Sequence, residues 1–155
     1  MLPREALHRE AYRLLKRFLE EARSLAPRCV ILFGSYAKGN FTEGSDIDLC
    51  LIAEKLPMDE LARRSLKSIQ SPRKIRAIGF YPEEFLQFLK GLRFIAYDIV
   101  SDGIPIYDDG FFLQAREVYE ECLRKYGIVK EAKGWRFALK PPSDENPKMG
   151  KEVKE

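Results

Sequence analysis

Two aspartates, Asp46 and Asp48, begin an apolar run and are separated by a single residue, Ile47. Side chains two apart on a β-strand point to the same face, about 6.6 Å apart at a rise of about 3.3 Å per residue. Carboxylate pairs of this kind are ligands for hard cations such as Mg²⁺ or Mn²⁺, which share their coordination with phosphate oxygens and water. The pattern predicts a site for one or two metal ions beside a nucleoside triphosphate.

A glycine and a serine, Gly34 and Ser35, follow directly on an earlier apolar run, residues 30–33. A glycine at the end of a strand lets the backbone come close to a phosphate, and the serine can cap the next turn and donate its hydroxyl to the same anion. Lys38 lies about one helical turn further on. We expect it to add positive charge to the same place.

The spacing of these residues resembles that of the minimal nucleotidyltransferase family of the polymerase-beta-like superfamily. Gly34-Ser35 is followed by ten residues and then by Asp46-Ile47-Asp48, with Gly39 inside the loop and Ser45 before the acids. The resemblance implies a nucleotidyltransferase fold in which Gly34, Ser35, Lys38 and Ser45 bind the nucleotide, and Asp46 and Asp48 bind metal and act in catalysis. The alternative is a solvated loop in which Ser45 and Asp46 cap a strand.

Members of the family carry a third acid on the next strand, where it helps to activate the attacking hydroxyl. Here no acid occurs between Ser71 and Tyr81, and Arg76 stands at the expected position. Three interpretations are open: Arg76 pairs with Asp46 or Asp48 and replaces the charge of a metal, it steadies a phosphate, or it points to solvent. A substitute acid would have to come from elsewhere, and the candidates are Glu54, Asp98 and Asp102.

The elements that position these residues alternate between helix and strand periodicity, which predicts the α/β (α+β) class, and the resemblance implies a small mixed sheet flanked by helices. We expect helices over residues 3–26, 57–69, 83–90, 92–100 and 111–126, and strands over residues 28–33, 46–53, 73–80 and 104–107. The loop between the first two strands is too short for a crossover helix, which predicts an antiparallel pair. Asp108 and Asp109 are expected to cap the last helix rather than to bind metal.

The C-terminal part is basic, with Trp135 and Phe137 among Lys133, Arg136 and Lys140. Stacking on a nucleic-acid strand is one interpretation, and docking of this segment on the domain or on a partner is the other. The prediction is one domain over residues 1–140 and a flexible polar tail over residues 141–155.

Composition sets further bounds on the class of protein. The 155 residues are 45% hydrophobic with a formal net charge of +3, which fits one domain and permits anionic ligands without identifying them. Three cysteines without a secretory leader, and no apolar segment of about 18 residues, predict a cytoplasmic protein without disulfides or membrane spans. The single histidine, His8, is expected to be a solvated helix residue, which leaves no base for a Ser-His-Asp triad.

We therefore predict a Mg²⁺-dependent nucleotidyltransferase that moves a nucleotidyl group, AMP from ATP in the first instance, to a hydroxyl with release of pyrophosphate. Stand-alone domains of this size resemble the antitoxin halves of HEPN/MNT toxin-antitoxin pairs, which implies a HEPN-type protein as acceptor; a homo-oligomer could also build the acceptor pocket. The alternative, favoured by Arg76, is a binding module that keeps the fold, lacks transfer activity and neutralises its partner by forming a complex.

Overall fold

The structure is a computed structural model that describes residues 4–66 and 74–138. A long helix, α1 (Arg4–Ala22), continues into a 3-10 turn, η1 (Arg23–Leu25), and leads to the first strand, β1 (Pro27–Phe33). The chain then forms α2 (Ser35–Lys38), β2 (Ile47–Ala53), α3 (Glu60–Arg63), β3 (Ile75–Phe80), α4 (Pro82–Lys90) and α5 (Phe94–Asp102). It ends with β4 (Ile104–Asp108), α6 (Phe111–Tyr126), β5 (Ile128–Glu131) and β6 (Gly134–Phe137).

Four strands form one mixed sheet in the order β3-β2-β1-β4. The pair β1–β2 is antiparallel, as the short loop predicts, and β2–β3 is parallel. The edge strand β4 carries Pro105, and its register with β1 shifts between Val30 and Ile31. An edge strand tolerates proline because one side of its backbone has no neighbour to bond. The fold class expected from the sequence, a mixed sheet flanked by helices, is confirmed.

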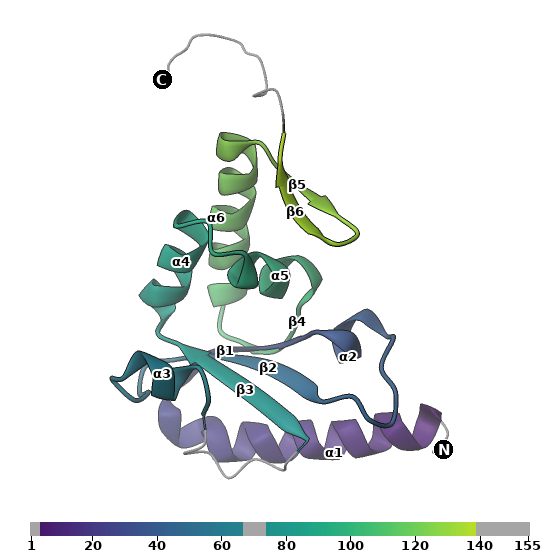
Figure 1. The fold of residues 1–155 in the computed structure, drawn as a ribbon. Helices are drawn as coiled ribbons and strands as arrows, with labels where there is room; N and C mark the ends of the chain where they lie inside the picture. Colours follow the sequence, from purple (N-terminus) through teal and green to yellow (C-terminus); the bar gives the residue numbers. More distant parts are fainter. Residues whose placement is uncertain (1–3, 67–73, 139–155) are drawn as a thin grey trace, which may run out of the picture.

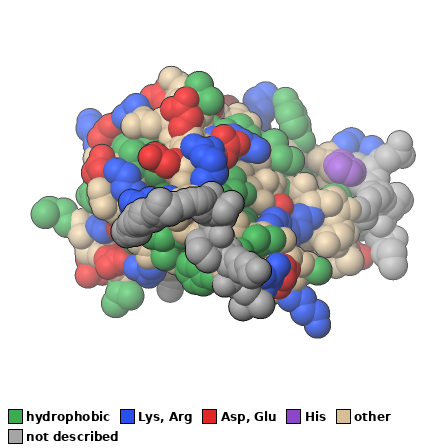
Figure 2. All heavy atoms as spheres, turned by 90° about the horizontal axis from the view of Figure 1, so that it is seen from above, with side chains coloured by type: hydrophobic (Ala, Val, Ile, Leu, Met, Phe, Trp, Pro, Cys, Tyr) green, Lys and Arg blue, Asp and Glu red, His purple; other side chains and the backbone are tan. Residues whose placement is uncertain are grey.

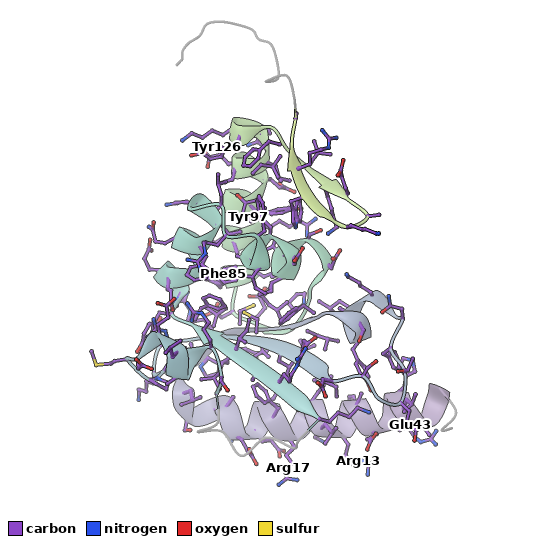
Figure 3. All side chains as sticks on the ribbon, viewed as in Figure 1. Arg13, Arg17, Glu43, Phe85, Tyr97 and Tyr126 are labelled. Carbon is purple, nitrogen blue, oxygen red and sulfur yellow. The ribbon has the colours of Figure 1, made fainter. Side chains whose placement is uncertain are left out.

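Two hydrophobic clusters lie on the two faces of the sheet, and Figure 1 shows α1 beneath one face and α4, α5 and α6 on the side of the other. On one face α1 covers Val30, Leu49 and Leu51, with Phe18 fully buried between helix and sheet. On the other face α4, α5 and α6 cover the alternate strand residues, including Cys29 and Cys50. Figure 3 shows the side chains of Arg13 and Arg17 on the side of α1 that faces away from the sheet. The period-two alternation of the strands thus decides which residues share a face with Asp48: Cys50 and Ile52, on the side of α5.

Local signals set most element ends where the sequence predicts them. The Asp59 side chain accepts a hydrogen bond from Ala62 N at the start of α3. Asp108 accepts from the backbone N–H groups of Gly110 and Phe112, and Asp109 from that of Phe111, so this pair caps α6 as expected. Gly127 ends the helix with a φ of 64°. All three cysteines are buried and free.

The expected helix over residues 57–69 is wrong in extent. It ends at Arg63, because Leu66 N donates to Ala77 O and joins the chain to β3 instead of continuing the helix. Residues 67–69, and the start of the third strand at Arg73, lie outside the described part of the chain. The helix expected over residues 92–100 begins at Phe94, since Leu92 adopts a φ of 59° and Arg93 N bonds back to Phe88 O.

A two-stranded hairpin, β5–β6, follows α6 and was not expected from the sequence. Figure 1 shows it beside α6, above α5 and on the side of the sheet that α5 covers. Lys140 and the expected tail, residues 141–155, lie outside the described part of the chain. None of the helices in the described ranges is long and apolar enough to span a membrane.

Candidate nucleotide and metal site

Gly34 and Asp48 meet where β1 ends and β2 begins. Phe33 is the register partner of Asp48, and Gly34 turns out of the strand with φ 76° and ψ −153°. A Cβ added at Gly34 would lie 2.4 Å from Asp48 Oδ2. Glycine is therefore required here for two reasons. Other residues avoid this backbone conformation, and the carboxylate of Asp48 leaves no room for a Cβ. The glycine loop and the acidic strand form one site.

Ser35 and Lys38 are the first and last residues of α2, a helix of only four residues. Lys38 N donates to Gly34 O at 3.1 Å, and Gly39 ends the turn with a φ of 81°. The Nζ of Lys38 lies 3.8 Å from Asp102 Oδ2 at the end of α5. Lys38 therefore stands beside the glycine loop, as the sequence leads one to expect, and is directed toward α5.

Ser45 closes the loop that connects α2 to β2. Its Oγ accepts a hydrogen bond from Thr42 N at 2.8 Å, and its own N–H donates to Thr42 O at 3.0 Å. The hydroxyl of Ser45 thus has a local partner, and its predicted role in nucleotide binding remains a prediction. These two hydrogen bonds between Thr42 and Ser45 hold the backbone that leads into Asp46.

The three polar side chains Asp46, Asp48 and Arg76 form an ion cluster on the face of the sheet that α5 covers. Arg76 is the register partner of Asp48 on the parallel strand β3. Its Nε lies 3.1 Å from Asp48 Oδ1 and 3.5 Å from Asp46 Oδ2. The hydrogen bond with Asp48 and the charge of that carboxylate raise the pKa of Arg76. Of the three interpretations of Arg76, pairing with the aspartates is the one that the structure shows.

None of the three substitute acids completes this cluster within the described residues. Glu54 pairs with Arg28 at 3.0 Å, beyond the opposite end of β2. Asp98 accepts a hydrogen bond from the indole N–H of Trp135 at 2.7 Å. Asp102 pairs with Lys38 and, at 3.3 Å, with Lys130. Across the described ranges, no group of three His, Cys, Asp or Glu side chains is close enough to hold one metal ion.

The two aspartates still provide a set of ligands for one hard cation. Asp46 and Asp48 offer carboxylate oxygens, and Mg²⁺ commonly uses only one or two carboxylates together with phosphate oxygens and water. Arg76 is the competitor for the same oxygens. Its side chain is 67% exposed, so it can turn into solvent when a cation enters. These residues fit one Mg²⁺ or Mn²⁺ in exchange for the guanidinium, and within the described ranges no third carboxylate joins them to hold a second ion.

A pocket of about 550 Å³ opens beside Gly34 and Lys38. Asp98 and Asp102 of α5 line it on a second side, and Lys130 and Lys133 of the hairpin line it on a third. The hairpin wall is not expected from the sequence; its turn is Ala132 and Lys133, and it is followed by Gly134, the first residue of β6, with a φ of 125°. The pocket shares Gly34 and Lys38 with the motif, whereas Asp46, Asp48 and Arg76 are not among its lining residues.

Trp135 holds the hairpin on the domain. It stacks on Phe94 and meets Tyr97 and Tyr119 edge to face, with ring centroids 5.5 to 6.2 Å apart. Its indole N–H donates to Asp98. Of the two interpretations of the C-terminal aromatic residues, docking on the domain is the one the structure shows for Trp135. Figure 2, which views the molecule from above, shows Lys and Arg side chains intermixed with Asp and Glu side chains over the coloured part of the face that it draws.

His8 lies far in sequence from the site and is exposed on α1. Its ring meets that of Phe41 edge to face, with centroids 5.1 Å apart. Phe41 in turn stacks on Tyr36 of α2 at 4.1 Å. This aromatic contact joins α1 to the loop after the glycine, and the exposure of His8 is that of the solvated helix residue expected from the sequence.

Comparison with known proteins places the motif in a family. Residues 15–110 match the family described as "Polymerase beta, Nucleotidyltransferase". This range contains the glycine loop, both aspartates and Arg76, and it ends before α6 and the hairpin. No curated protein matches the sequence.

Solved structures with a similar fold include two toxin-antitoxin complexes and a candidate nucleotidyltransferase from Sulfolobus solfataricus. The first is a toxin-antitoxin with AMP-PNP, with 18% identity over 71% of this chain and 90% of the other, at a TM-score of 0.43. The Sulfolobus protein has 23% identity over 63% of this chain and 79% of the other, with a TM-score of 0.46. A mutant of the toxin-antitoxin MntA-HpeT has 16% identity over 71% and 89% of the two chains, with a TM-score of 0.41.

Proposed function

Because this chain belongs to the polymerase beta nucleotidyltransferase family, we propose that it binds a nucleoside triphosphate, ATP in the first instance, and transfers the nucleotidyl group to a hydroxyl. The contact between Gly34 and Asp48 carries this proposal. It puts a backbone suited to a close phosphate approach and a carboxylate suited to a cation within one small space. Neither feature by itself would identify a triphosphate. Together they provide space for its phosphate chain and a ligand for the cation that accompanies it.

The roles of the residues follow from their positions. The backbone at Gly34 admits the phosphate chain, and Ser35 stands next to it at the start of α2. Lys38 offsets the charge that develops on the leaving pyrophosphate. The acceptor hydroxyl loses its proton to water as its oxygen forms a bond to the α-phosphorus and the bond from that phosphorus to the bridging oxygen of the β-phosphate breaks, and pyrophosphate departs. Asp46 and Asp48 would hold Mg²⁺ or Mn²⁺, which when bound neutralises phosphate charge and makes the phosphorus more electrophilic.

We propose a protein hydroxyl as the acceptor, with a HEPN-type toxin as the first candidate partner and this chain as its antitoxin. The described residues beyond the family match, α6 and the hairpin, pack onto the domain and do not form a separate acceptor module. A partner chain, or a second copy of this one, would then supply the acceptor pocket. The motif and its resemblance to stand-alone nucleotidyltransferases support this choice.

A second function, favoured by Arg76, is a binding module without transfer activity. The guanidinium contacts both aspartates and stands where the family carries its third acid. In this case the site would bind a nucleotide, or none, and the protein would act by covering its partner. The two functions differ in whether label moves from the nucleotide to the partner, which a direct experiment can decide.

The test is calorimetric titration of the wild-type protein with ATP in the presence and absence of Mg²⁺, followed by incubation with ATP labelled on the α-phosphate and a HEPN-type partner. The double variant Asp46→Ala/Asp48→Ala removes the cation ligands. Glu117→Gln, an exposed acid on α6, is the matched control for loss of a carboxylate.

Mg²⁺-dependent binding that the double variant loses and the control keeps, together with transfer of label, supports the enzyme. Binding or partner inhibition without transfer supports the module. Failure of the wild type to bind any triphosphate or to transfer label would refute the nucleotidyltransferase proposal.

A further inference from the structure

The hairpin side of the pocket carries positive charge that faces the glycine loop. Gly34 and Lys38 line the pocket on one side and Lys130 and Lys133 on another. Both hairpin lysines lie outside the region that matches the family, residues 15–110. They are therefore a feature of this chain that the family motif does not account for.

Asp102 is shared by two lysines from opposite walls. Its Oδ2 atom lies 3.8 Å from Lys38 Nζ of α2 and 3.3 Å from Lys130 Nζ of the hairpin. The carboxylate thus stands between two ammonium groups and links α2 to the hairpin. An anionic group that entered the pocket at this point would meet both lysines at once, and it would compete with Asp102 for them.

The other acids of the pocket are already engaged. Asp98 accepts the indole N–H of Trp135, and Glu131 pairs with Arg136. Lys133 makes no ion pair within the described residues and adds a positive charge on the hairpin side of the pocket. Three lysines and three acids line the pocket, so an anionic ligand is favoured not by net charge but locally, where displacing Asp102 would give it both Lys38 and Lys130. A pocket of about 550 Å³ has room for a nucleotide rather than for a single phosphate.

We propose that the β5–β6 hairpin is the outer wall of the nucleotide pocket and that Lys130 is a phosphate-binding residue, which exchanges Asp102 for the polyphosphate when the ligand enters. This inference rests on the proposed function, because it assigns a further residue to the same site. The ligand class is a polyphosphate ester, and the contact is with phosphate oxygens rather than with the base.

Trp135 gives the exchange a direct signal. It is the only tryptophan in the chain, and Lys130 Nζ lies 4.6 Å from the centre of its ring. Movement of the ammonium group from Trp135 and Asp102 to a phosphate removes a cation from the indole face. We expect ATP and inorganic triphosphate to change the emission of Trp135 to a similar degree, since both carry the phosphate chain.

The experiment titrates the full-length protein with ATP and with inorganic triphosphate, in the presence of Mg²⁺, and follows Trp135 fluorescence and heat. Lys130→Gln is expected to weaken both ligands about three- to tenfold, the range for a charge-assisted contact that is partly exposed. Asp102→Asn is expected to strengthen both about two- to fivefold, because the competing carboxylate loses its charge. Lys125→Gln is the matched control, since Lys125 also lies over an aromatic ring, that of Tyr126, and does not line the pocket.

Opposite effects of Lys130→Gln and Asp102→Asn support the proposal, with circular dichroism confirming that each variant is folded. Wild-type affinity in Lys130→Gln would overturn it, as would weaker binding in Asp102→Asn. If binding requires Asp46 and Asp48 but ignores Lys130 and Asp102, only this inference falls. If the wild type binds neither ligand, the proposed function falls as well.

Discussion

Arg76 and Asp48 lie directly opposite each other on the parallel strands β3 and β2, and their side chains are joined by a contact of 3.1 Å. Register partners on neighbouring strands project to the same face, so the aspartate cannot avoid the arginine unless the long side chain rotates away. The position at which the sequence leads one to expect a third acid thus holds a cation. Asp46, Asp48 and Arg76 form a cluster of two carboxylates and one guanidinium.

Replacing Arg76 is expected to change the affinity for Mg²⁺ in a defined order. Arg76→Asp supplies a third carboxylate, so it should bind Mg²⁺ most tightly, Arg76→Gln should be intermediate and the wild type weakest. Without metal, Arg76→Asp should lower the free energy of unfolding by about 1 kcal/mol, because three like charges then meet. Thermal unfolding at increasing Mg²⁺ concentration measures both effects.

The outcome that contradicts this account is a wild type that gains as much thermal stability from Mg²⁺ as Arg76→Asp does. Arg76 would then have no competing role. Arg76→Gln removes the guanidinium without adding a carboxylate, so it separates these two effects of Arg76→Asp.

Gly34→Ala is expected to destabilise the protein and to abolish nucleotide binding. An alanine at this position would be strained by the φ of 76°. Its methyl group would also lie only 2.4 Å from Asp48 Oδ2. Backbone strain costs about 1–3 kcal/mol, and displacement of Asp48 comes on top of it. Urea unfolding gives the stability and calorimetry the binding.

Gly39→Ala is the matched control for Gly34→Ala. Gly39 has a similar φ of 81°, but a Cβ there meets nothing within 4 Å. Gly39→Ala should therefore lose stability through backbone strain alone, without a steric clash, and should still bind the nucleotide. Equal losses in the two variants would mean that the contact between Gly34 and Asp48 has no particular importance.

Glu84 is expected to contribute to stability in a pH-dependent way. Burial opposes its ionisation, but hydrogen bonds from Arg63, Arg64 and the Tyr81 N–H outweigh burial and lower the pKa of Glu84. The stabilisation is therefore fully present above the unfolded pKa, about 4.3, and is lost as the pH falls through the lower folded value. Glu84→Gln should cost about 2–4 kcal/mol at pH 7, since Arg63 is left buried without its charge partner.

The measurement is urea unfolding of wild type and Glu84→Gln from pH 7 down to pH 3. The gap in free energy of unfolding should narrow below about pH 4 as the wild-type carboxylate becomes protonated. Glu83→Gln, an exposed neighbour on α4, should change stability by less than about 0.5 kcal/mol. If the difference in free energy of unfolding between the two proteins stays constant down to pH 3, the charge of Glu84 does not contribute to stability.

The three cysteines are expected to be unreactive in the folded protein. All are buried, and desolvation raises the pKa of the Cys29 and Cys50 thiols, so little thiolate is available. A thiol-reactive disulfide reagent should find no accessible thiol at pH 8 in the native state and three in guanidinium. Rapid labelling of the native protein would place at least one cysteine in a part of the structure that opens.

The sequence by itself determined the local features of this protein. The Asp46-Ile47-Asp48 alternation, the glycine after an apolar strand, and the Asp59 and Asp108-Asp109 caps each depend on residues within a few positions of one another. The limits of α6, Phe111 and Tyr126, are those the pattern predicts. Such signals can be read from the chain because periodicity and capping are short-range properties of the backbone.

The tertiary structure decided the contacts that give the site its character. Which of three roles Arg76 takes depends on the register of β3 against β2, and Arg76 and Asp48 are 28 positions apart in the sequence. Trp135 and Asp98, which are in contact, are 37 positions apart, and Lys130 and Asp102 are 28 apart. The early end of α3 likewise follows from the bond between Leu66 and Ala77. Pairings across such distances are set by packing of the whole sheet and its helices, and no local pattern of residue types encodes them.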